Sequence, residues 1–447
     1  MDPLLLGGLA FAIAMALIAL RLPIGYALGG ISVVATFIMY ASPATGGFDM
    51  ERAIRPTLSL IANNSFSFIH SYELSLVPLY ILLGALAYRT GITTDIYQAM
   101  RVWLAKAPGG LAMASIMGCG GFSAITGSSV ACAATMGRIA VPEMLRYGYS
   151  PRLSTASVAA GGTLGSLIPP SVPFAIYGIF TEQSISKLFL AGVGPGVLSM
   201  VGYLLVVWLW VRKRPQDAPS SGLHFVRRDY LLAMVRAWPA VLLFLIIVVG
   251  IYGGIFTATE AAAVSVAVVL ALGIVAKRLT WRAFFESLTE ATIQTAAIFF
   301  VAVGAKTFAT FIALTGAANE VVLWIGSLGL AEWTVLLAIT GLYLVLGMFL
   351  DSLGILLLTL PVMVPLVEGM GINLIWFGVI VIKMLEIGLI TPPVGFNCFV
   401  IHSVVAGKAQ LQDIFIGIWR FLMMDIVVMG LILAFPLISL WLPTMAG

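Results

Sequence analysis

The chain has 447 residues, of which 61% are hydrophobic and 9% are charged, with a formal net charge of +4. Ordinary soluble domains carry about 25% charged residues, and a soluble protein of this size could not hide so much apolar surface from water. The composition therefore excludes a soluble protein and predicts an all-α polytopic membrane protein. A β-barrel would instead show short segments of alternating polarity.

Apolar runs that are long enough, or nearly long enough, to cross a bilayer recur along the chain. Examples are residues 4–20, 241–256, 261–276 and 293–314. The first run lacks a basic segment before it and a clear cleavage site after it, so we expect a retained first span rather than a signal peptide. Each half also contains an amphipathic stretch, at 50–61 and 280–289, suited to lying at the membrane interface.

Positive charge is concentrated in residues 212–236, which contain six arginines and lysines against two aspartates. The positive-inside rule places this linker in the cytoplasm. A second basic loop, residues 276–282, follows two spans later and falls on the same side. Basic cytoplasmic loops explain this charge, so we expect no nucleic-acid partner.

The sequence contains an internal repeat, which can mark a transporter. An offset of 223 residues aligns Ser129 with Ser352, Pro142 with Pro365, Gly148 with Gly371, Gly165 with Gly388, Pro169 with Pro392 and Pro170 with Pro393. An offset of 225 aligns Thr90-Gly91 with Thr315-Gly316. Arg21 lies in the turn between the first two spans of the first half and favours the cytoplasmic side for it. The matching turn of the second half must face outside, because the loops on either side of that pair of spans are cytoplasmic. We therefore expect the two repeats to be inverted.

Each repeat carries a pair of adjacent prolines, Pro169-Pro170 in "GSLIPPS" and Pro392-Pro393 in "GLITPPVG". Proline removes a backbone donor and clashes with the preceding helical turn, so a pair opens a membrane helix and frees carbonyl oxygens. Freed carbonyls suit a hard cation such as Na⁺, and the following helix N-terminus suits an anion. The alternative is a plain proline kink.

A cluster of small and polar residues precedes each proline pair, at residues 120–131 and 346–354. Each lies in an apolar stretch too long for one span and too short for two, which favours a re-entrant helical hairpin. The hairpin tips would place polar side chains near the membrane midplane: Ser123, Thr126, Ser128 and Ser129 in the first, Asp351 and Ser352 in the second. Alternatively, these hydroxyls bond their own helix backbones.

Charged residues inside apolar segments are candidates for function. Asp351 is the clearest, and Lys383 and Glu386 share one helical face, where they would neutralise each other as a structural or functional pair. Glu260 follows a span end, where it would cap a helix, and Lys306 has no assigned role. The three cysteines lack metal-ligand spacing and are expected to be packing residues.

Enzyme motifs are weak in this sequence, which has no nucleotide-binding G-x-x-x-x-G-K-[ST] loop and no H-E-x-x-H motif. Transport driven by an ion gradient is the leading hypothesis. Two alternatives remain: a self-sufficient ion-coupled dicarboxylate elevator carrier, and a structural or proton-conducting subunit of a membrane enzyme complex.

Five segments together resemble the large membrane subunit of tripartite ATP-independent periplasmic (TRAP) transporters, the DctM-like family. They are "GSLIPPS", "GLITPPVGFN", "GGFSAITGSSVACAATMG", "GIYGGIFTATEAAAV" and "SISKLFLAGVGPG". The resemblance implies an inverted-repeat, elevator-type transporter with two re-entrant hairpins and two unwound Pro-Pro helices. It also implies sodium-coupled symport of a small organic acid, a carboxylate or a sulfonate, across the bacterial cytoplasmic (inner) membrane.

The resemblance also implies partners and domains. The partners are a small four-span DctQ-like membrane subunit, a DctP-like periplasmic solute-binding protein, the organic-acid substrate and the lipid bilayer. The implied domains are scaffold at 1–90, transport domain at 91–211, cytoplasmic linker at 212–236, scaffold at 237–316 and transport domain at 317–447.

The resemblance further implies two or more coupling Na⁺ ions where the hairpin tips meet the unwound segments. The implied ligands are Ser123, Thr126, Gly165, Ile168 and Pro169 in the first site, and Gly347, Gly388, Thr391 and Val394 in the second. Thr126 stands where the family pattern leads us to expect serine, and it keeps the hydroxyl oxygen. The implied substrate-binding or gating residues are Ser128, Ser129, Pro170, Asp351, Ser352, Pro392 and Pro393.

Overall fold

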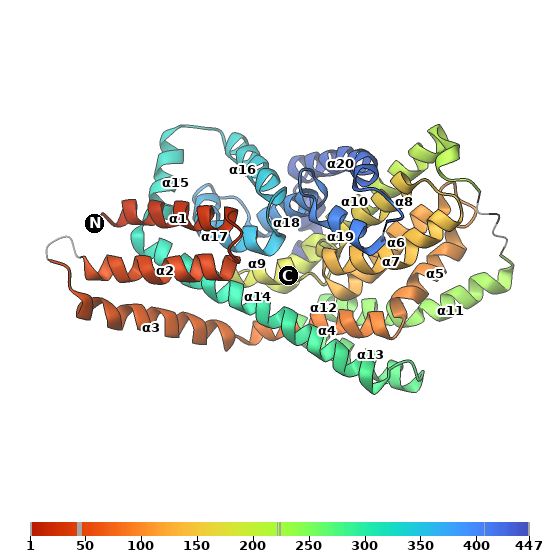
Figure 1. Cartoon of the computed structure of the whole chain (residues 1–447), viewed down its shortest axis with the longest axis horizontal. Helices are drawn as coiled ribbons and strands as arrows, with labels where there is room; N and C mark the ends of the chain where they lie inside the picture. Colours follow the sequence, from red (N-terminus) through yellow and green to blue (C-terminus); the bar gives the residue numbers. More distant parts are fainter. Residues whose placement is uncertain (1, 43–46, 221, 223–224, 406, 446–447) are drawn as a thin grey trace.

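The computed structural model describes residues 2–42, 47–220, 222, 225–405 and 407–445, and within these ranges the fold contains helices and no strand (Figure 1). Seven of the described helices are long and apolar enough to cross a membrane, or up to eight if one bent pair counts as a single span. The prediction of an all-α polytopic membrane protein is confirmed. Residues 221, 223 and 224 of the predicted linker lie outside the described residues.

The first half of the chain forms the following elements. They are α1 (Pro3–Ala19), α2 (Ile24–Ala41), α3 (Met50–Ile69), η1 (Tyr72–Ser75), α4 (Leu76–Arg89), α5 (Ile92–Leu104), α6 (Gly110–Thr126), α7 (Ser129–Arg146), α8 (Pro151–Thr163), η2 (Leu164–Ser166), α9 (Val172–Thr181), α10 (Ile185–Lys213) and η3 (Pro215–Asp217).

The second half continues with a comparable set. It comprises α11 (Arg227–Phe244), a π-helical turn η4 (Leu245–Val249), α12 (Gly250–Tyr252), α13 (Ala258–Val275), α14 (Trp281–Thr315), α15 (Ala317–Ser327), α16 (Glu332–Gly347), α17 (Ser352–Gly369), α18 (Leu374–Ile390), α19 (Phe396–Val405), α20 (Leu411–Ala434) and α21 (Leu437–Met445).

Helix boundaries recur in the two halves at the repeat offset. Ser129 begins α7 and Ser352 begins α17, so both predicted hairpins have their break at matching positions. The proline pairs lie in matching breaks, between η2 and α9 and between α18 and α19. The sequence repeat therefore corresponds to a repeat of helix–break–helix units.

One long element distinguishes the halves. The chain at 50–89 is divided into α3 and the η1–α4 segment, with a bend of 56°, whereas α14 runs through 35 residues without a break. The division falls at His70 and Ser71, between the end of α3 and the start of η1. The amphipathic stretch 280–289 forms the start of α14 and is continuous with the apolar segment that follows it.

The core is centred on the broken helices. Every residue of α18 except Ile375 is buried, as is every residue of α8 from Leu153 onward. Helix α18 is apolar apart from Lys383 and Glu386, and α8 consists largely of small residues on which neighbouring helices can pack closely. Helices α16, α17, α10 and α20 pack around α18, while α6, α7 and α20 pack around α8.

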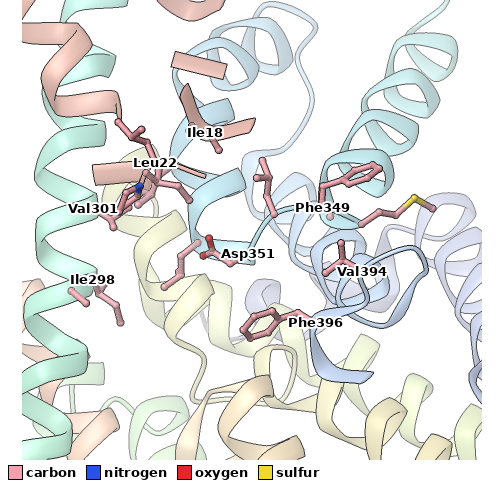
Figure 2. Close-up of a pocket in the computed structure, with 16 residues that line it drawn as sticks. Ile18, Leu22, Ile298, Val301, Phe349, Asp351, Val394 and Phe396 are labelled. Atoms are coloured by element: carbon pink, nitrogen blue, oxygen red, sulfur yellow. The ribbon is translucent and has the colours of Figure 1, made fainter. Parts of the chain in front are cut away.

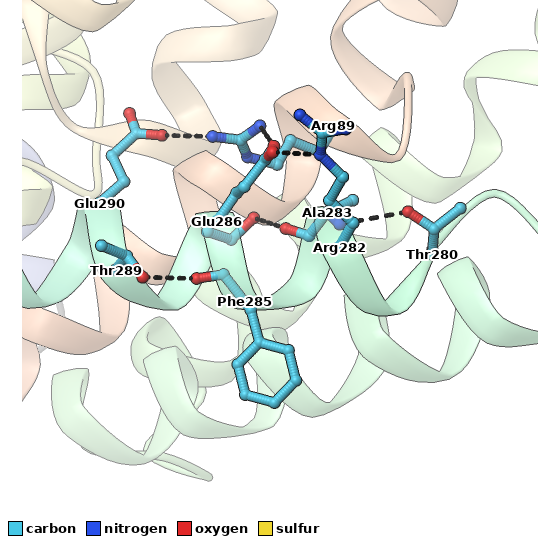
Figure 3. Close-up of polar contacts among 9 residues, drawn as sticks. Arg89, Thr280, Arg282, Ala283, Phe285, Glu286, Thr289 and Glu290 are labelled. Carbon is cyan, nitrogen blue, oxygen red and sulfur yellow. Dashed lines mark hydrogen bonds and ion pairs between the residues drawn. The ribbon is translucent and has the colours of Figure 1, made fainter.

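An ion cluster joins α4 to the start of α14 (Figure 3). Arg89, in the last turn of α4, donates to Glu286 across 2.7 Å and to Glu290 across 3.0 Å, and Arg282 donates to Glu286 across 2.8 Å. The Arg89 cation also complements the negative end of the α4 dipole.

At the N-terminus of the neighbouring helix α13, Thr257 and Glu260 form a capping box, which confirms the capping role expected of Glu260.

Candidate transport site

The first hairpin tip lies against the break in its own repeat. Helix α6 ends at Gly127, whose φ of +63° favours glycine, and the Ser128 hydroxyl caps α7. A Cβ at Gly127 would lie 2.6 Å from the Pro170 carbonyl oxygen, and the Val172 N–H donates to the Gly127 carbonyl. The tip and the unwound segment therefore meet backbone to backbone.

The second tip shows the same kind of contact. Asp351 accepts from the Gly354 N–H across 3.1 Å and caps α17. A Cβ at Gly388 would lie 2.5 Å from the Gly347 Cα, and a Cβ at Gly347 would lie 2.9 Å from the Gly388 Cα. No side chain fits between these two backbones, so both glycines are required for the tip to reach α18.

Both proline pairs interrupt regular helix. Residues 167–171 and 391–395 fall outside α-helix, and the Pro169-Pro170 and Pro392-Pro393 peptide bonds are cis. Ser171 caps the next helix by accepting from the Phe174 N–H, and its hydroxyl donates to the Ser166 carbonyl. A plain kink would leave one continuous helix, so the predicted unwinding is confirmed.

Two cavities lie beside the tips. The larger, about 510 Å³, is formed by the second tip and by α1, α2 and α14 (Figure 2), and Asp351 and Val394 line it. The smaller, about 150 Å³, is lined by residues of both tips, including Ser128, Ser129, Asp351 and Ser352. The structure thus brings four of the six predicted polar side chains of the two tips to one cavity, whereas Ser123 and Thr126 are buried in α6 and do not line it.

Some of the hydroxyls predicted to bind ions instead form hydrogen bonds with the backbone of their own helix, which was the alternative interpretation. The Thr126 hydroxyl donates to the Phe122 carbonyl across 3.3 Å, and that of Thr391 donates to the Ile387 carbonyl across 2.6 Å. Ser123 instead contacts the Cys132 sulfur across 3.7 Å. A hydroxyl that donates in this way still has lone pairs available to a cation.

The residues expected to hold Na⁺ fit a cation of that kind. Gly165 lies so close to the first tip that a Cβ would be 2.7 Å from the Ser128 carbonyl oxygen, and Ile168 and Pro169 follow directly in the break. In the second repeat Gly347 and Gly388 are in close contact, and Thr391 and Val394 follow in the break after α18. Backbone carbonyls and hydroxyls are the oxygen ligands that hard cations prefer. A bound Na⁺ would add a positive charge between tip and break.

The expected pairing of Lys383 with Glu386 is wrong. Glu386 accepts a hydrogen bond from the Ser129 hydroxyl across 2.7 Å, and Ser129 and Ser166 are 2.7 Å apart. Lys383 instead donates to Asp425 across 2.5 Å and to Ser199 across 3.1 Å. Although the two residues share a helical face, each bonds a side chain on another helix.

Sequence reasoning missed the partners in this network. Asp425 accepts from both Lys383 and the Tyr203 hydroxyl, and Tyr203 is 3.0 Å from the Thr163 hydroxyl. Asp425 lies within an apolar stretch, so the rule that singled out Asp351 would also have found it. Ser166, next to Gly165, carried no signal beyond its position before the proline pair.

These features define a class of protein. Paired hairpins docked on two interrupted helices within a polytopic helical bundle are the architecture of a secondary membrane transporter. The profile of one family, described as "Tripartite ATP-independent periplasmic transporter, DctM component", matches residues 11–438. The chain therefore belongs to this family, as the five sequence segments predicted.

Curated relatives agree with this assignment. The chain is 33% identical over 388 residues to the C4-dicarboxylate TRAP transporter large permease protein of Pseudomonas aeruginosa, covering 87% of this chain and 90% of the relative. It is 32% identical over 388 residues to the sialic acid TRAP transporter large permease protein of Vibrio cholerae, with 86% and 90% covered.

A third relative is longer than this chain. The isethionate TRAP transporter permease protein of Oleidesulfovibrio alaskensis is 31% identical over 354 residues, which are 79% of this chain and 55% of the relative. A solved structure, that of the YdaH transporter of Alcanivorax borkumensis, shares the fold with a TM-score of 0.62 at 14% identity, covering 100% of this chain and 99% of that one.

Proposed function

We propose that the chain is the large membrane subunit that imports a small organic acid into a bacterium across the cytoplasmic membrane. The observation that carries this proposal is the pair of hairpin tips docked on two broken helices around one cavity. The relatives are named for C4-dicarboxylate, sialic acid and isethionate transport. All three are anions with a carboxylate or sulfonate group.

The cavity walls indicate how such an anion is held. Among the residues that the structure describes, those that line the two cavities include no lysine or arginine. The N-termini of α7 and α17 open at the tips, where they present backbone N–H groups and the positive ends of helix dipoles. Ser128 and Ser352 add hydroxyl donors. The substrate acid group is therefore bound by helix ends and hydroxyls rather than by a cationic side chain.

Energy for import comes from Na⁺ bound at the two tip–break contacts, with at least two ions per cycle. Each contact joins a hairpin to a broken helix, so ion binding favours the closed tip that encloses substrate. The transport parts, at 91–211 and 317–447, then move as an elevator against the scaffold at 1–90 and 237–316. A small four-span subunit and a periplasmic binding protein complete the transporter and deliver the substrate.

The test is uptake in liposomes containing this chain, the small subunit and the binding protein. Succinate, sialic acid and isethionate are offered separately, with and without an inward sodium gradient. We expect uptake of one acid, dependent on both the gradient and the binding protein. Uptake without sodium would refute the coupling, and uptake by this chain alone would favour the self-sufficient carrier.

A further inference from the structure

Glu386 is a buried carboxylate with an unused oxygen. Its residue is 1% exposed, and Ser129 and Ser166, at 3% each, are equally enclosed. Oε2 accepts from the Ser129 hydroxyl, which in turn lies 2.7 Å from the Ser166 hydroxyl. Oε1 has no hydrogen-bond partner within the described part of the chain. Buried polar atoms are rarely left without a partner, so this oxygen has a partner that the protein itself does not supply: a water molecule, a proton or an ion.

The charge around Glu386 is not balanced by the protein. Lys383 and Asp425 are the charged groups close enough to interact with it, and they neutralise each other across 2.5 Å. A hydroxyl such as that of Ser129 stabilises a carboxylate but does not cancel its charge. An isolated charge in a dry interior is strongly unfavourable, so this carboxyl is neutralised by a proton or by one bound cation.

The surrounding groups suit a small hard cation. Glu386, Ser129 and Ser166 offer side-chain oxygens from α18, α7 and η2, and no nitrogen or sulfur takes part in their hydrogen bonds. Oxygen ligands select hard cations, and a single uncompensated carboxylate is matched by a monovalent one. Ser129 and Ser166 also line the 150 Å³ cavity, which gives an ion a route to the carboxylate.

We propose that Glu386, Ser129 and Ser166 bind a further Na⁺, separate from the ions at the two glycine-lined contacts. None of these three residues belongs to the ligand sets expected there. The ion joins the first hairpin to α18 of the second repeat, so it couples the closure of one half to the other. This inference rests on the proposed sodium coupling.

The test counts sodium ions. Equilibrium binding of radioactive Na⁺ to the purified chain in lipid nanodiscs gives the number bound and their affinities. We expect Glu386→Gln to bind one Na⁺ fewer per chain than wild type. Ser166→Ala should bind that ion about tenfold more weakly, because it loses one ligand oxygen. Glu368→Gln, at an exposed position on α17, should bind like wild type.

The outcomes separate this inference from the proposed function. A wild-type chain that binds no Na⁺ refutes the sodium coupling itself. An unchanged ion count in Glu386→Gln, even with altered affinity, overturns only the additional site. Should Glu386→Gln fail to fold, judged by circular dichroism, Ser166→Ala decides the question, and unaltered binding by that variant also overturns the proposal.

Discussion

The ammonium group of Lys383 lies 2.5 Å from the carboxylate of Asp425, with side chains that are 0% and 1% exposed. The pair connects α18 to α20, and the Tyr203 hydroxyl extends it to α10. The broken helix α18 and two of its neighbours, α20 and α10, are thereby joined by one set of side-chain contacts. Removal of either partner would leave the other as an uncompensated buried charge.

Lys383→Met should lower the free energy of unfolding by about 3–5 kcal/mol, because it leaves Asp425 buried and unpaired. The double variant Lys383→Met, Asp425→Leu should recover most of this loss, since both charges are gone. Thermal unfolding of the detergent-purified chain measures both. Arg152 and Asp413 form a matched surface pair, 48% and 26% exposed, and Arg152→Gln should cost about 1 kcal/mol or less.

If Lys383→Met unfolds at the wild-type temperature, the pair does not hold α18 in place. A double variant no more stable than the single one would show that steric fit, rather than charge, governs this position.

Gly388→Ala should abolish uptake while leaving the rest of the helical bundle folded. The added methyl group would meet the Gly347 Cα at 2.5 Å, so the second tip must move away from α18. Gly347→Ala should act in the same direction. The matched control is Gly341→Ala, on the same helix as Gly347, where nothing lies within 4 Å of an added Cβ. Uptake of substrate by reconstituted protein is the measurement, and wild-type uptake by Gly388→Ala would refute the close contact.

Thr391→Ala should raise the sodium concentration needed for half-maximal uptake about tenfold, because a ligand oxygen is lost. Its hydroxyl already donates to Ile387, so its lone pairs are the part available to an ion. Thr391→Ser keeps the oxygen and should resemble wild type. An equal loss in both variants would assign the effect to packing of the methyl group.

Asp351 both caps α17 and lines the two cavities, and substitution can separate these two roles. Asn is as good a helix N-cap as Asp, so Asp351→Asn should leave the free energy of unfolding within about 0.5 kcal/mol of wild type. It removes the carboxylate that lines both cavities, and we expect the KM for substrate to change about tenfold.

Asp351→Ala removes the cap as well and should cost about a further 1 kcal/mol of stability. Comparison of KM and thermal unfolding for the two variants distinguishes the roles. An unchanged KM in both would exclude Asp351 from the substrate path.

The sequence predicted the parts of the site that depend on local chemistry. Proline pairs interrupt helices wherever they occur, and small or polar residues at 127–129 and 351–352 stop one helix and cap the next. It did not predict which buried charges meet. Spacing along α18 placed Lys383 and Glu386 on one face, but Asp425 and Ser129 come from helices far away in sequence, and only tertiary packing brings them near.

The continuity of α14 was also beyond local reasoning, because an amphipathic start and an apolar continuation are each compatible with a break or with none. The ligand sets, domain boundaries and partners remain predictions, since they concern ions and proteins that bind this chain.

Helix α14, at about 1.5 Å per residue, is about 52 Å long, against a hydrocarbon core of about 30 Å. It packs along α2, α3, α4 and α17, so one straight rod touches both halves of the chain (Figure 1). In the first repeat, the corresponding segment is bent by 56° between α3 and the η1–α4 segment. The two halves, although they share one pattern, therefore differ in this element: α14 is one continuous helix, whereas the first repeat is bent at residues 70–71, where we expect any flexing of this part of the bundle to occur.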